Sequence, residues 1–126
     1  MTRETFARIA AVLLIIHGLI EVSALFALKL MTNSLVSFGG MDPAQIKANT
    51  GSIVALGTLW GLTRFMAAWG AWSLKKWGVA LGIAMSLVTM SAAVTVIPAG
   101  VTDTFTAALV LGLLLYTWFG REKFEA

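Results

Sequence analysis

Long apolar runs alternate with short polar segments along this chain, and four of the runs are about as long as a membrane crossing. An α-helix needs about 20 mostly apolar residues to cross the hydrocarbon of a bilayer. A soluble bundle would need a polar stripe along the outer face of each helix, and no stripe wide enough is present. The pattern predicts an all-α integral membrane four-helix bundle with spans Ile9 to Leu28, Ser52 to Leu74, Trp77 to Ile97 and Thr104 to Gly120.

The composition removes several other classes of protein. The 126 residues are 59% hydrophobic and include no cysteine, so a disulfide framework or a thiolate metal site is excluded. Four spans and their loops use nearly the whole length. This predicts a single transmembrane domain over residues 1–126 rather than a membrane anchor joined to a soluble domain.

Basic residues gather at alternate ends of the predicted spans, which sets the expected orientation. With four spans, one side of the membrane receives Arg3, Arg8, Lys75, Lys76, Arg121 and Lys123. Loops rich in lysine and arginine stay in the cytoplasm. We therefore expect a multi-pass protein of the cell (inner) membrane with both termini cytoplasmic. The net charge of +3 is explained by attraction to the lipid bilayer, without a nucleic-acid partner.

The start of the chain must be distinguished from a cleaved signal peptide. Arg3 and Arg8 precede an apolar run, but His17 and Glu21 interrupt it, and a secretory apolar region is uninterrupted and about 7 to 15 residues long. The first run is therefore expected to remain as a span.

In the long first external loop, Asp42 and Pro43 are typical of a helix start and predict a short surface helix from Pro43 to Ala48.

His17, Glu21 and Arg64 are the strongly ionisable side chains inside the predicted spans. A charge near the bilayer centre costs about 2.5 to 3.5 kcal/mol on insertion scales. His17 and Glu21 are four residues apart and share a helix face. Counted along antiparallel helices at about 1.5 Å per residue, Arg64 falls at a depth between them. Its planar guanidinium is therefore expected to pair with Glu21 while His17 lies alongside.

Two interpretations of these three residues remain open. The pair of Glu21 and Arg64 is compatible with a purely structural clasp, because buried ion pairs can fix which helices pack together. Intramembrane ionisable groups also mark ligand sites and proton pathways, and histidine can exchange a proton near neutral pH. His17, Glu21 and Arg64 are therefore candidate ligand-binding residues. No catalytic constellation is present, and one histidine cannot complete a common metal site, so no metal or cofactor is expected.

Small residues spaced along the predicted helices indicate close helix packing. Gly57 and Gly61 lie on the same face as Arg64, and Gly78, Gly82 and Ser86 form a ridge on the third span. Such small residues let helix backbones approach each other. These five residues are predicted to pack helices within the bundle, and they are also compatible with a homo-oligomer or a larger membrane complex.

The pair His17-Gly18 and the segment from Gly61 to Gly78, GLTRFMAAWGAWSLKKWG, carry a resemblance. The chain resembles small bacterial four-helix membrane proteins of the DoxX-like type and related uncharacterised families, which implies a compact membrane bundle. The spacing of His17 and Glu21 is also similar to the histidine and glutamate pair in sterol isomerases of the EXPERA superfamily. The further acidic partners of that superfamily have no counterpart in the predicted third and fourth spans.

Three functions follow from these observations. The first is binding or movement of a small lipid-soluble or anionic ligand, held by Arg64 and coupled to protons through Glu21 and His17. The second is an accessory or assembly subunit of a larger membrane complex, with a structural clasp. The third is an intramembrane acid–base isomerase, the only chemistry these side chains permit. A cationic substrate is disfavoured because Arg64 competes for Glu21, the sole carboxylate inside the spans.

Overall fold

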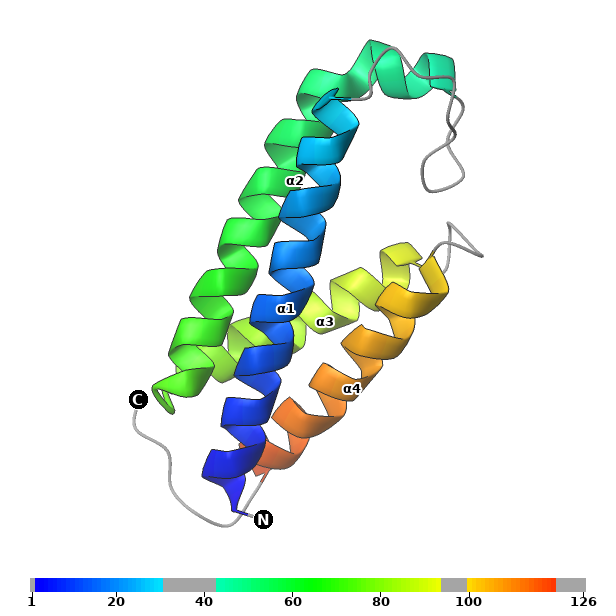
Figure 1. Ribbon diagram of the computed structural model, residues 1–126. Coiled ribbons are helices and arrows are strands. Elements are labelled where there is room, and N and C mark those ends of the chain that lie inside the picture. Colours follow the sequence, from blue (N-terminus) through cyan, green and yellow to red (C-terminus); the bar gives the residue numbers. More distant parts are fainter. Residues whose placement is uncertain (1, 31–42, 94–99, 120–126) are drawn as a thin grey trace.

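The computed structural model describes residues 2–30, 43–93 and 100–119, and all of its regular structure is helical. The helices are α1 (Arg3–Leu30), α2 (Pro43–Trp72), α3 (Lys76–Ala93) and α4 (Gly100–Phe119). The long helices α1 and α2 lie side by side, and the shorter α3 and α4 form a second pair beside them (Figure 1). The predicted all-α, four-helix architecture is confirmed.

Three helices are long and apolar enough to cross a membrane. They comprise Arg3–Phe26 of α1, Lys76–Ala93 of α3 and Val101–Phe119 of α4. Within the described residues, α2 does not belong to this group, although it contains 30 residues. Its apolar stretch is interrupted by Arg64 and by several glycines and threonines, which lower its mean hydropathy.

The distribution of side-chain sizes is the reverse of that in a water-soluble bundle. Small residues dominate the interior, where Ala10, Ala11, Ala67, Ala68 and Ala71 are completely buried. Large apolar side chains on all four helices face outward, among them Ile20, Leu59, Trp69 and Phe105. In lipid, burying large apolar side chains between helices gains no hydrophobic free energy. Helices associate there through small residues that allow close packing.

The predicted surface helix and second span form one continuous element. Helix α2 begins at Pro43, the first-turn proline of the predicted helix, but continues beyond Ala48 through Gly51 to Trp72. Its first turns point away from the long axis of the remaining helix (Figure 1). The prediction of a separate short helix is therefore wrong, because the helix continues without interruption between Ala48 and Ser52. The expected cap Asp42 lies outside the described residues.

The turn between α2 and α3 is as tight as the sequence predicts, but Leu74 forms its centre. The Lys75 N–H donates to the Gly70 carbonyl at 2.8 Å, and the Leu74 N–H donates to the Ala71 carbonyl at 3.1 Å. This pair of bonds is the Schellman arrangement that ends many helices. Leu74 has φ 58°, a left-handed conformation that usually favours glycine. The turn reverses the chain and starts α3 at Lys76.

Arg3 joins the start of α1 to the end of α4. Its Nε donates to the Thr117 carbonyl at 2.7 Å and its Nη2 to the Trp118 carbonyl at 3.2 Å. Both carbonyls belong to the last turn of α4, where helical partners are lacking and positive charge is favoured. At the same end, the Arg8 guanidinium lies 5.4 Å from the Trp72 ring at the end of α2. We call this the basic end of the bundle.

This contact predicts a different effect for two arginines on the same helix. Arg3→Gln is expected to lower the free energy of unfolding by about 2 kcal/mol, because hydrogen bonds from a charged donor to buried carbonyls are lost. Arg8→Gln is the matched control and should cost less than about 1 kcal/mol, since Arg8 is exposed and pairs only with Glu4 and the Trp72 face. Unfolding in mild detergent measures both values, and equal losses would contradict the capping role.

Candidate functional site

Small residues on α1 and α2 bring the two helices close enough for their polar side chains to meet. A Cβ at Gly57 would lie 2.6 Å from Leu25, and a Cβ at Gly61 would lie 3.1 Å from Val22. Gly57 and Gly61 therefore do pack against α1, as their spacing predicts. Gly18 of α1 accommodates the ring of Phe65 in the same way. The resulting register sets Glu21 opposite Arg64.

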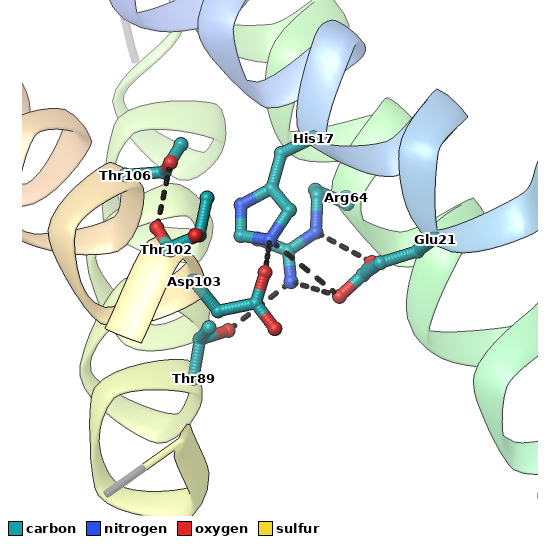
Figure 2. Close-up of polar contacts among 7 residues, drawn as sticks. All are labelled: His17, Glu21, Arg64, Thr89, Thr102, Asp103 and Thr106. Atoms are coloured by element: carbon teal, nitrogen blue, oxygen red, sulfur yellow. Dashed lines mark hydrogen bonds and ion pairs between the residues drawn. The ribbon is translucent and has the colours of Figure 1, made fainter. Parts of the chain in front are cut away.

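Arg64 is the most deeply buried charged side chain in the described part of the protein, with 1% of its surface exposed. Its Nε donates to Glu21 Oε2 at 2.9 Å and its Nη2 donates to Glu21 Oε1 at 2.8 Å. Nη2 also donates to the Thr89 hydroxyl of α3 at 3.1 Å. This forked geometry is the strong form of an arginine–carboxylate contact. Arg64 thus joins α1, α2 and α3 in one layer (Figure 2).

His17 completes the cluster but has a partner that the sequence did not suggest. Its Nε2 lies 3.1 Å from Asp103 Oδ1 on α4 and 3.9 Å from Glu21 Oε1. The structure therefore brings His17, Glu21 and Arg64 together and adds Asp103 and Thr89 (Figure 2). All four helices contribute to this polar cluster, which we define as His17, Glu21, Arg64, Thr89 and Asp103.

Asp103 was missed because the fourth span was expected to start at Thr104. Helix α4 starts at Gly100 instead, so Asp103 lies in its first turn. The sequence does contain a pattern that places the Asp103 side chain on the interior face of α4. Asp103 begins a stripe with spacings of four and three that continues through Ala107, Val110, Leu114 and Thr117, all buried in the bundle. The prediction that Glu21 is the sole carboxylate inside the spans is therefore wrong, because Asp103 lies within the apolar helix α4.

Exposure differs across the cluster. The side chains of Arg64 and His17 are 1% and 2% exposed, whereas those of Glu21 and Asp103 are 25% and 50% exposed. Toward the basic end, the bundle interior is closed by an apolar core that contains Leu14, Val79, Val110 and Leu114. The exposed part of the cluster is therefore formed by Asp103 and Glu21, and its side toward the basic end is covered by the apolar core.

Charge is not balanced within the cluster. Arg64 contributes one positive charge, and Glu21 and Asp103 contribute one negative charge each when ionised. With a neutral imidazole at His17, one net negative charge remains. A proton bound by the His17–Asp103 pair, or an external cation, would bring the net charge to zero.

Two buried polar atoms near the cluster have no hydrogen-bond partner among the described residues. They are Nδ1 of His17 and Oγ of Ser86. A protonated imidazole needs an acceptor at each nitrogen, whereas a neutral one needs an acceptor only at the nitrogen that carries hydrogen. Nε2 of His17 faces the Asp103 carboxylate, whereas Nδ1 faces no acceptor among the described residues.

The packing residues expected on α3 also face the bundle interior. Gly78 contacts the backbone of Gly70, where the crossing of α2 and α3 leaves no room for a Cβ, and Gly82 faces Leu114 of α4. Ser86 is completely buried. Gly70 is a packing residue that was not predicted from the sequence. Its position beside the buried alanines Ala67 and Ala71 on one face of α2 could have indicated this role.

Metal binding and known relatives add no further assignment. In residues 2–30, 43–93 and 100–119, no group of three or more histidine, cysteine or acidic side chains is placed to hold a metal ion. Comparison with models of protein families gives no match, and comparisons with curated proteins and with solved structures give no similar protein. The resemblance to DoxX-like proteins stays a prediction.

Proposed function

We propose that this protein is a small four-span protein of the cell membrane that binds or moves a lipid-soluble small molecule at the polar cluster, with coupled exchange of a proton. In this proposal α2 crosses the membrane with the other helices and both termini are cytoplasmic. The basic end then faces the cytoplasm, where positive residues are favoured. Polar side chains that face the interior of a membrane bundle commonly mark such sites.

One observation carries the proposal: the cluster is partly open and electrically unbalanced. A structural clasp needs only Glu21 and Arg64, which satisfy each other at 2.8 and 2.9 Å. The second carboxylate, Asp103, is half exposed and meets a histidine rather than the arginine. A histidine–carboxylate pair supplies a group able to exchange a proton near neutral pH. The cluster therefore supports an exchange function as well as a clasp.

The alternative is an accessory or assembly subunit of a larger membrane complex. This alternative is favoured by the burial of Arg64, whose contacts with Glu21 and Thr89 already join three helices. The many outward apolar side chains would serve a lipid and a protein partner equally well. An acid–base isomerase using His17 with Glu21 remains a third proposal, now with Asp103 as the nearest carboxylate to the imidazole.

Native mass spectrometry of protein extracted gently from its own membrane tests the proposal. We expect a stoichiometric small molecule that is lost in Asp103→Asn, because this change removes the exposed charge while preserving the side-chain shape. Thr106→Val is the matched control on the same helix, since the Thr106 hydroxyl donates only to the Thr102 carbonyl of its own helix. This variant should retain the molecule.

The opposite results are equally informative. A protein free of small molecules, or one bound only to other polypeptides, would overturn the binding proposal and support the accessory subunit. A small molecule that survives Asp103→Asn and His17→Gln unchanged would separate ligand binding from the polar cluster.

A further inference from the structure

The sequence alone suggests a lipid-soluble or anionic ligand held by Arg64, but the contacts around this arginine oppose an anion. Arg64 is 1% exposed, and its Nε and Nη2 already donate to Glu21 and Thr89. An anion that took over the Nε–Nη2 fork would displace Glu21 and leave its carboxylate without a partner in an apolar setting. Losing the partner of a buried charge typically costs about 3 to 5 kcal/mol.

The group that faces an incoming ligand is instead the carboxylate of Asp103. It is half exposed, and Arg64 does not contact it. Exposed apolar residues such as Val101 and Phe105 lie within one turn of it along α4, but on other faces of the helix. A carboxylate between an apolar surface and a polar interior is complementary to a ligand that joins apolar bulk to positive charge.

The state of His17 supplies an independent observation. Its imidazole is buried, and Nδ1 faces no acceptor, so a second ring hydrogen would have no partner. With an uncharged imidazole and two ionised carboxylates, the cluster carries one net negative charge at a site of limited exposure. The groups around His17 are Glu21 on its own helix, Arg64 on α2, the uncharged Thr89 on α3 and Asp103 on α4. No other positive side chain is present among these contacts to balance Asp103.

We infer that the polar cluster is a site for one exchangeable cation at Asp103: either a proton held by its carboxyl group beside His17, or the positive group of a lipid-soluble amine or phosphonium ion. This inference rests on the proposed binding function and specifies its ligand class. Binding of the organic cation releases the proton, and binding of the proton releases the cation. The net charge of the occupied cluster is zero in both states. Arg64 and Glu21 position the site and do not contact the ligand.

Two lipid-soluble ions of the same shape and opposite charge test the ligand class. Tetraphenylphosphonium and tetraphenylborate are each titrated into the full chain in a neutral detergent, and binding is measured by equilibrium dialysis. We expect tetraphenylphosphonium to bind with one-to-one stoichiometry and to be displaced when the solution is made acidic, because protons compete for the same carboxylate. Tetraphenylborate should show no saturable binding.

Variants at Asp103 separate charge from fold. Asp103→Asn should lower the affinity for tetraphenylphosphonium by about tenfold or more, since one charge contact is lost. Asp103→Glu keeps the charge and should retain binding, so a loss in both variants together with normal melting behaviour would contradict the assignment. Thr106→Val should bind as the unmodified protein does.

The outcomes distinguish this inference from the proposed function. Saturable binding of tetraphenylborate that is lost in Arg64→Met would overturn the cation assignment but keep a binding role for the cluster. Failure of both ions to bind would overturn the cation site, while native mass spectrometry would separately decide whether the cluster holds another molecule. Binding of the cation with no dependence on Asp103 or on pH would place it elsewhere on the apolar surface and would also refute the inference.

Discussion

Replacing Glu21 with leucine is expected to lower the free energy of unfolding by about 4 kcal/mol, the largest effect of any single substitution considered for this protein. The carboxylate accepts two hydrogen bonds from Arg64, and the arginine is 1% exposed. Arginine cannot lose its charge inside a protein. The substitution would therefore leave an obligatory positive charge in the bundle without its principal counter-charge.

Arg64→Met should cost less, about 3 kcal/mol, because the carboxylate left behind is less buried than the guanidinium. The Glu21 side chain is 25% exposed, whereas that of Arg64 is 1% exposed. The double substitution Glu21→Leu with Arg64→Met should recover most of the loss, since apolar residues often replace a buried ion pair without a stability cost. Reversible unfolding in detergent provides the four free energies of this cycle. Additive losses would show that the two side chains do not interact.

The pairing of Glu21 with Arg64 could be predicted because it depends on helical periodicity and depth alone. A spacing of four residues on α1 and a similar count from the ends of α1 and α2 determine which side chains face each other. The two side chains can meet only if the helices also lie close together, and Gly57 and Gly61 predict this close approach. These are local features of two helices joined in sequence. The helix pair and its polar contact follow from such features without knowledge of the rest of the fold.

The contact between His17 and Asp103 could not be predicted in the same way, because it joins residues 86 positions apart and depends on where α4 begins. Charge at Asp103 favoured an assignment to an external loop, since charged residues usually mark the end of a span. The helix begins earlier because a carboxylate in the first turn of a helix is itself favourable. The one-turn extension moves Asp103 from the loop to the interior stripe of α4 and changes the predicted charge of the site.

The continuity of α2 has a related cause. The sequence pattern predicts a surface helix from Pro43 to Ala48 and a span from Ser52 to Leu74, with Gly51 between them. Glycine in a helix costs only about 1 kcal/mol relative to alanine, and that cost is small compared with the hydrogen bonds of a 30-residue helix. Figure 1 shows a change of direction in the first turns of α2, but the helix does not end there.

Gly78→Ala is expected to destabilise the bundle by about 3 kcal/mol, although alanine is the better helix former. A Cβ at this position would enter the backbone of Gly70 and Ala71, which cannot move as a flexible side chain would. The α2–α3 crossing would have to widen. This crossing lies at the tight turn centred on Leu74. Moving α3 away from α2 there would also shift the Thr89 hydroxyl relative to the Arg64 guanidinium. We therefore expect weaker ligand binding as well as a lower free energy of unfolding.

Gly112→Ala provides the matched control. Gly112 lies within α4, and a Cβ there would meet no atom within 4 Å. The same chemical change should stabilise the protein by about 0.5 to 1 kcal/mol through helix propensity alone. Opposite signs for the two variants, measured as unfolding free energies in the same detergent, would show that contact between helix backbones requires glycine at position 78. A stabilising effect at both positions would mean that α2 and α3 do not approach this closely, and the layer that unites Arg64 with Thr89 would then lose its structural basis.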